Sequence, residues 1–191
     1  MKSEISKEEL KDYPKTAFKG KIFVIENMKQ YGAALDMLKG HKILGFDTET
    51  RPSFKKGKTN KLALLQLSTE NEAFLFRVNK IGLPSEILQL MSSKIIIKVG
   101  LGLKDDLQKL KQTAHFNANG FIDLQEIVEN YGINDKSLKK VSAIVLGHKI
   151  SKNQQLSNWE SKELTEAQQL YAATDAWICL KIYQKLSSTP S

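Results

Sequence analysis

The sequence predicts a mixed α/β fold, in which helices flank a sheet that combines an antiparallel meander with further buried strands. The first half of the chain alternates short apolar runs with turn-like segments. Two of these runs, 61–68 and 72–78, are separated only by the polar residues 69–71, so we expect them to pair in an antiparallel way. After residue 100 the apolar residues recur mostly at helical spacing. The pattern does not determine the order of the strands.

The boundaries of the elements follow from apolar periodicity and from end signals. We expect strands at 21–25, 41–49, 61–68, 72–78 and 94–99, with a short one near Phe121. We expect helices at 28–38, 84–91, 103–114 and 124–130, then one from Ser137 to Gly147 and a last one that begins at Thr165. Ser137 can cap its helix, and Thr165 with Gln168 has the spacing of a capping box.

Length and composition indicate one domain with loose ends. A chain of 191 residues with 41% hydrophobic residues can bury one good core, which we place at residues 21–187. Residues 1–20 are polar, rich in both charges and contain Pro14, so we expect a flexible arm rather than a core element. Residues 188–191 are expected to form a flexible tail.

Cysteine use and hydropathy bear on the compartment. Cys179 is the single cysteine, which excludes an intramolecular disulfide, and its apolar neighbours indicate a buried thiol. No apolar run approaches the length of a membrane span, and the charged N-terminus lacks the apolar core of a signal peptide. We therefore expect a cytoplasmic protein without a membrane partner.

The net charge of the chain indicates what kind of partner it binds. A formal net charge of +8 favours an anionic partner. Five positive residues follow one another without an intervening acid, namely Arg51, Lys55, Lys56, Lys58 and Lys61. This composition fits a loop that contacts phosphates, and it also fits a loop that is merely solvated.

Carboxylates in otherwise buried segments are the main functional signal. Asp47 and Glu49 stand two apart on an expected strand and so project from one face, where Gly45 leaves space beside them for a ligand or metal. Tyr171 and Asp175 stand four apart and share one face of the last helix. Buried carboxylates lose hydration and repel one another, so a cation is the natural compensation. Solvated acids at a strand end and a buried Tyr–Asp pair are the alternatives.

A fifth candidate follows the glycine turn after the strand at 94–99. Asp105 and Asp106 lie in the expected first turn of a helix there, where their negative charges can also interact favourably with the helix dipole. The turn is no dinucleotide motif, because Asp105 occupies the third glycine position of G-x-G-x-x-G. Oxygen ligands without a cluster of Cys or His favour Mg²⁺ or Mn²⁺ over zinc. The three histidines show no ligand spacing: His41, His115 and His148.

The segments FDTET, VGLGLKDDLQKL and SNWESKELTEAQQLYAATDA resemble, in order and spacing, the three exonuclease motifs of the DEDD superfamily, tyrosine subclass. The similarity covers residues 22–186. The resemblance implies a ribonuclease H-like fold, with an antiparallel meander plus parallel strands flanked by helices. It also implies 3′-to-5′ hydrolysis of a nucleic acid, with release of nucleoside 5′-monophosphates.

Residue roles come with the same resemblance. The metal-binding tetrad would be Asp47, Glu49, Asp106 and Asp175, holding two Mg²⁺ or Mn²⁺ ions. Asp47 would bridge the two metals, Glu49 and Asp175 would complete the one on the nucleophile side, and Asp106 would hold the second through water. Tyr171 would orient the attacking water, since an unperturbed phenol has a pKa of about 10. Asp106 is preferred over Asp105 by motif position.

The expected substrate is the 3′ end of a single strand or a recessed duplex, with DNA favoured over RNA. One alternative is RNA 3′-end processing of the ribonuclease D type, although Lys162 and Glu163 stand where such chains tend to carry Arg-Pro. A non-catalytic nucleic-acid-binding module is the other. Substrate contacts are expected from Thr48, Arg51, Lys55, Lys56, Lys58 and Trp159. Trp159 would stack on a base, with core packing as the competing interpretation. A helicase or repair partner cannot be named from this sequence.

Overall fold

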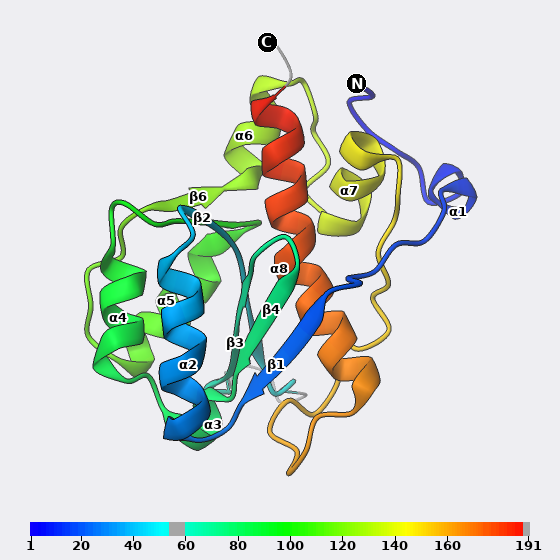
Figure 1. Ribbon diagram of the computed structural model, residues 1–191. Helices are drawn as coiled ribbons and strands as arrows, with labels where there is room; N and C mark the ends of the chain where they lie inside the picture. The colour runs from blue at the N-terminus through cyan, green and yellow to red at the C-terminus, as the bar shows by residue number, and fades with distance from the viewer. Residues whose placement is uncertain (54–59, 189–191) are drawn as a thin grey trace.

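A six-stranded mixed sheet forms the centre of the computed structural model, which describes residues 1–53 and 60–188 (Figure 1). Its strands are β1 (Lys21–Ile25), β2 (Ile43–Thr50), β3 (Leu62–Ser68), β4 (Glu72–Phe76), β5 (Ile97–Gly100) and β6 (Phe121–Asp123), in the order β1-β4-β3-β2-β5-β6. β2, β3 and β4 form the antiparallel meander, while β1 pairs with β4, β5 with β2 and β6 with β5 in parallel. The predicted mixture of antiparallel and parallel pairing is confirmed.

Helices cover both faces of this sheet (Figure 1). They are α1 (Glu9–Asp12), α2 (Met28–Lys39), α3 (Val78–Ile81), α4 (Ser85–Ser92), α5 (Leu103–Thr113), α6 (Leu124–Asn130), α7 (Leu138–Leu146) and α8 (Glu166–Ser187). The apolar sides of α2, α4 and α5 pack on one face, in a core with Phe46, Leu65 and Phe74. On the other face α8 crosses β2, β3 and β4 and also packs on α6 and α7. None of the helices in the described part of the chain is long and apolar enough to cross a membrane.

Several details differ from the prediction, among them two strand boundaries and one helix cap. The strand expected at 72–78 ends at Phe76, because the backbone turns into α3 at Val78. The strand expected at 94–99 begins only at Ile97. Ser137 precedes α7, yet its side chain makes no capping hydrogen bond. The capping box of Thr165 and Gln168 is present at the start of α8, as predicted.

The N-terminal segment packs on the domain, contrary to the expected flexible arm. Ile5 and Leu10 lie in a small apolar cluster with Ala143 of α7. The backbone N–H of Phe18 donates to Thr174 Oγ1 of α8 at 3.1 Å, and the Phe18 ring is buried. These contacts differ from the expectation of an arm rather than a core element. The apolar residues of the segment are too widely spaced among charged ones to produce a recognisable periodicity.

Candidate active site

Close contact between α8 and β2 creates the site. A Cβ atom on Gly45 would lie 2.0 Å from the backbone carbonyl oxygen of Ala176, so only glycine lets the helix approach this far. The space that the sequence analysis reserved for a ligand at Gly45 is therefore filled by the helix backbone, which corrects that expectation. The approach brings Asp175 beside the acids of β2. Carboxylate oxygens of Asp47, Glu49 and Asp175 lie within 4.8 Å of one another.

Asp106 reaches the same end of β2 from the opposite face of the sheet. It lies in the first turn of α5, and its Oδ1 accepts a hydrogen bond from Thr48 Oγ1. Asp105, its neighbour, is exposed and takes no part in this contact. Thr48 alternates with Asp47 and Glu49 along β2, so its side chain projects from the opposite face, where it meets Asp106. This geometry favours Asp106 over Asp105, and it gives the Thr48 hydroxyl a partner inside the protein.

The acids lie too close together and are too buried for all of them to ionise at the same time. Burial, followed by the charges of Asp175, Glu49 and Asp106, raises the pKa of Asp47 well above its usual range. Burial, followed by the charges of Asp175 and Asp106, raises the pKa of Glu49 to about 9. Burial also raises the pKa of Asp175 to about 7, while its hydrogen bond with Tyr171 and the positive charge of Lys152 act in the opposite direction.

These properties fit a divalent metal site. All donors are carboxylate oxygens, the ligands that Mg²⁺ and Mn²⁺ prefer. Asp175 Oδ1 is buried and has no hydrogen-bond partner within the described protein. Lys109 lowers the pKa values of Glu49 and Asp106 through its charge, but it does not cancel the effect of burial. A bound cation would supply the missing compensation.

Tyr171 stands at the edge of the acidic cluster. Burial first, and then the charges of Asp175 and Glu49, raise the pKa of its hydroxyl far above the ordinary value. The phenol is therefore a hydrogen-bond donor at any physiological pH. Its ring lies 5.9 Å from the ring of Trp159, measured between ring centres.

Trp159 is 0% exposed and packs with Leu64, Leu75 and Ala172. This burial fits core packing, the competing interpretation of Trp159, and leaves no exposed ring face for stacking on a base. The loop that carries Trp159 is tied to the sheet by buried Arg77, which donates to the carbonyl oxygen of Ser161. Trp159 therefore packs beside Tyr171 in the same apolar cluster.

The cleft over the acids has a volume of about 230 Å³. Besides the acids, Thr48 and Tyr171, it is lined by residues that include Lys152 and Gln155. Neither residue was predicted, because residues 148–162 are polar and have no regular apolar spacing. No periodicity or motif spacing marks a loop residue that reaches a site about twenty positions further along the chain.

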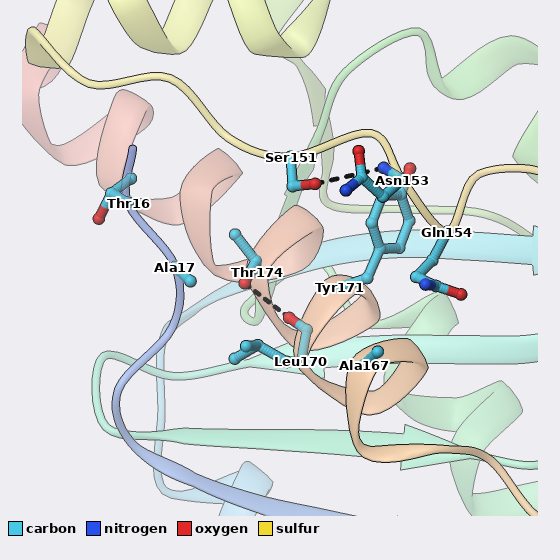
Figure 2. A pocket seen from close by; sticks show the side chains of 9 residues that line it. All are labelled: Thr16, Ala17, Ser151, Asn153, Gln154, Ala167, Leu170, Tyr171 and Thr174. Atoms are coloured by element: carbon cyan, nitrogen blue, oxygen red, sulfur yellow. Dashed lines mark hydrogen bonds between the residues drawn. The ribbon is translucent and has the colours of Figure 1, made fainter. Parts of the chain in front are cut away.

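A second cavity of about 200 Å³ adjoins the cleft at Tyr171 (Figure 2). Figure 2 shows the 151–154 stretch and the N-terminal segment on either side of α8, with Tyr171 beside Asn153 and Gln154. Thr16 and Ala17 of the N-terminal segment line this cavity. The segment expected to be a free arm thus forms a wall next to the site.

The expected substrate contacts are only partly described. Arg51 forms an exposed ion pair with Glu160 at 3.5 Å and does not point into the acidic cluster. The predictions for Lys55, Lys56 and Lys58 lie outside the described residues. His41, His115 and His148 are exposed, and Cys179 is buried, as predicted.

Comparisons with known proteins agree with this site. A model of the 3′-5′ exonuclease family matches residues 22–189. The bifunctional 3′-5′ exonuclease/ATP-dependent helicase WRN of Mus musculus is 34% identical over 157 residues, 76% of this chain and 11% of that protein. The human exonuclease mut-7 homolog is 31% identical over 194 residues, 87% of this chain and 22% of that protein. The chain therefore spans less than a quarter of either relative.

A structural match supports the same fold. The Trypanosoma brucei RNase D in complex with RNA U12 has a TM-score of 0.81 at 20% identity, over 91% of this chain and 65% of that chain. The fold is thus ribonuclease H-like, as the resemblance implied. Since the family match runs from β1 through α8 and includes every acid of the cluster, the chain belongs to the 3′-5′ exonuclease family.

Proposed function

We propose that this domain removes nucleotides one at a time from the 3′ end of a nucleic acid and releases nucleoside 5′-monophosphates. The observation that carries this proposal is the gathering of Asp47, Glu49 and Asp175 within 4.8 Å, with Asp106 joined to β2 through Thr48. Three acids with raised pKa values that line one cleft, with a fourth hydrogen-bonded to the strand between them, would destabilise a domain that only bound nucleic acid. A polyanionic substrate approaches such a cluster only when cations neutralise it.

Each acid has a distinct place in the proposed mechanism. The pKa of Asp47 responds to the charges of the other three acids, so Asp47 would be the ligand common to the bound ions. Glu49 and Asp175 would hold one ion together with it, and Asp106 would contribute to holding the other. Bound divalent ions supply Lewis acidity toward the scissile phosphate and lower the pKa of water.

Tyr171 orients the attacking water in this scheme. Its hydroxyl keeps its proton, because burial and the adjacent acids raise its pKa, and it can therefore donate a hydrogen bond but cannot act as a base. Lys152, which lines the cleft and lowers the pKa of Asp175, is placed to hold a phosphate of the incoming strand.

DNA is proposed as the preferred substrate, and RNA is the alternative that the experiment must separate. The test is digestion of matched DNA and RNA, single-stranded and recessed, with Mg²⁺, with Mn²⁺ and with excess chelator. We expect a descending ladder from a 5′-labelled strand and labelled mononucleotide from a 3′-labelled strand, with no digestion in chelator. Internal cuts, loss from the 5′ end or activity in chelator would overturn the proposal. Faster digestion of RNA would overturn only the preference.

A matched pair of variants tests the motif assignment in the same assay. Asp106→Asn removes the acid that contacts Thr48, whereas Asp105→Asn changes its exposed neighbour. We expect the first to be inactive and the second to retain activity within about threefold, the range of a surface charge change. The reverse pattern would move the metal ligand to Asp105.

A further inference from the structure

Gln66 is a buried amide without a partner. Its side chain is 0% exposed, and neither Nε2 nor Oε1 makes a hydrogen bond. Within residues 1–53 and 60–188, no other side chain leaves both a buried donor and a buried acceptor unpaired. Burying an amide in this way is unfavourable, because its hydrogen bonds to water are lost and none replaces them.

The position of Gln66 relates it to the metal site. On β3 it is the direct antiparallel partner of Asp47 on β2. Directly paired residues project from the same face of a sheet, with Cβ atoms about 5 Å apart. Gln66 therefore stands beside Asp47 on the face that α8 covers.

The other neighbours of Gln66 are apolar. Leu75 is its partner on β4, and Leu64 precedes it on the same face of β3. Both leucines pack with Trp159 and Ala172 under α8. A leucine or methionine at position 66 would suit this environment better, so packing does not explain the amide.

The unpaired acceptors near this face belong to the acidic cluster. Asp175 Oδ1 is also buried and also lacks a partner. Carboxylates that bind a metal are commonly held in orientation by a hydrogen bond from a neighbouring group, and loss of that group weakens metal binding. A donor at Gln66 Nε2 is placed to act in this way.

We infer that Gln66 is a positioning residue for the metal ligands. With a cation bound, its Nε2 would donate to the carboxylate of Asp47, directly or through one buried water, and would hold the orientation of that ligand. The inference rests on the metal site of the proposed function. In the metal-free protein the buried amide has no partner.

The test compares Gln66→Met with the matched control Leu75→Met, which changes the cross-strand neighbour of Gln66 without removing an amide. Mn²⁺ binding is measured by electron paramagnetic resonance in the absence of substrate, and unfolding of the metal-free proteins is measured in denaturant. We expect Gln66→Met to bind Mn²⁺ about 10- to 100-fold more weakly. Its metal-free form should be at least as stable as the parent, because two unpaired polar atoms are removed. Leu75→Met should bind Mn²⁺ within about twofold of the parent.

Mn²⁺ affinity of Gln66→Met equal to that of the parent would overturn the inference. A second measurement avoids any dependence on folding of the variant: in the parent protein, addition of Mg²⁺ should shift the side-chain amide resonances of Gln66. Unmoved resonances under saturating Mg²⁺ would also overturn it. A parent that binds Mn²⁺ tightly but digests no nucleic acid would refute the proposed function and leave the role of Gln66 standing.

Discussion

Two buried charged regions of the same sheet differ in where the partners of the charged groups come from. Lys98 on β5 is 0% exposed, and its Nζ lies 3.1, 2.9, 2.8 and 2.7 Å from the carbonyl oxygens of Leu90, Ser93, Ile96 and Asn119. It also lies 4.9 Å from the centre of the Phe121 ring. The acidic cluster at the end of β2 contains three acids within 4.8 Å of one another, and the charges of Lys152 and Lys109 do not cancel the effect of burial on their pKa values. The protein itself supplies every partner of the ammonium group, whereas the carboxylates depend on ions from solution.

The difference separates a structural charge from a functional one. Burial lowers the pKa of Lys98 to about 8, so the group remains mainly charged at neutral pH and can donate to its carbonyl partners. The acids have raised pKa values and face a cleft. Lys98 has all its partners within the protein, so no position is left there for a bound ion. The acids face a cleft, so an ion can reach them. Changes at the two regions should therefore affect stability and activity in opposite proportions.

Asp47→Asn should have the largest effect on activity. It removes charge from the central ligand with little change of shape, so nuclease turnover should fall by at least about a thousandfold. Stability of the metal-free protein should not fall, because a source of repulsion is lost. The checks are digestion of a labelled strand and denaturant unfolding of the same preparation. Turnover near that of the parent would refute the metal assignments.

Lys98→Met should show the reverse pattern. Loss of the ammonium group leaves buried carbonyl oxygens without donors, which should lower the free energy of unfolding by about 2 to 4 kcal/mol. Activity per folded molecule should stay within about twofold of the parent. Lys94→Met, at an exposed lysine near the start of β5, is the matched control and should leave stability within about 0.5 kcal/mol. Equal stabilities of the two variants would show that Lys98 is not a closed structural site.

Tyr171→Phe should be milder than Asp47→Asn at the same site. The hydroxyl orients water and carries no ligand charge, so turnover should fall by about a hundredfold while Mn²⁺ affinity changes little. Single-turnover rates and metal titration separate the two quantities. A loss of Mn²⁺ affinity as large as the loss of rate would make Tyr171 a support of the ligands instead.

The pH dependence of stability should be the smallest effect. Burial raises the pKa of Glu49 to about 9 and that of Asp175 to about 7, above the ordinary value of about 4. Between these values the folded state retains protons that the unfolded state has released, so stability is lost as the pH rises through the folded-state pKa values. The Tm of the metal-free protein should therefore fall by a few degrees from pH 5 to pH 8.

Added Mg²⁺ should reverse this trend by favouring the ionised acids, and it should raise the Tm more at pH 8 than at pH 5. Asp47→Asn is the control, because it removes one of the coupled acids and should flatten the metal-free profile. A metal-free Tm that increases between pH 5 and pH 8 would contradict the raised pKa values.

Local signals in the sequence predicted most of the fold. The meander formed where a three-residue polar turn joins two apolar runs, and α8 began at the capping box of Thr165 and Gln168. The alternation of Asp47 and Glu49 correctly predicted a shared face. These features depend on residues within a few positions of one another, and a pattern can therefore reveal them.

Long-range contacts account for what the sequence did not show. The pairing of Gln66 with Asp47 depends on the register of β3 on β2, and the sequence of neither strand predicts that register. Burial of Trp159 depends on a loop that returns to cover β3 and β4. The packing of Phe18 under Thr174 joins segments more than 150 positions apart. In each case the partner is fixed by the tertiary fold, and local composition gives no signal.

The Gly45 contact has a consequence for how such a domain can change its substrate. The spacing of Asp47 and Asp175 is set where helix backbone meets strand backbone, not by any surface loop. Residues 151–156, which are mostly exposed, can therefore be exchanged to reshape the approach to the cleft, while buried Trp159 and the ligand spacing stay fixed. Engineering of new strand or base preferences should begin in that segment. Gly45→Ala, by contrast, should move Asp175 on α8 away from Asp47 on β2 and abolish activity, whatever residues that segment carries.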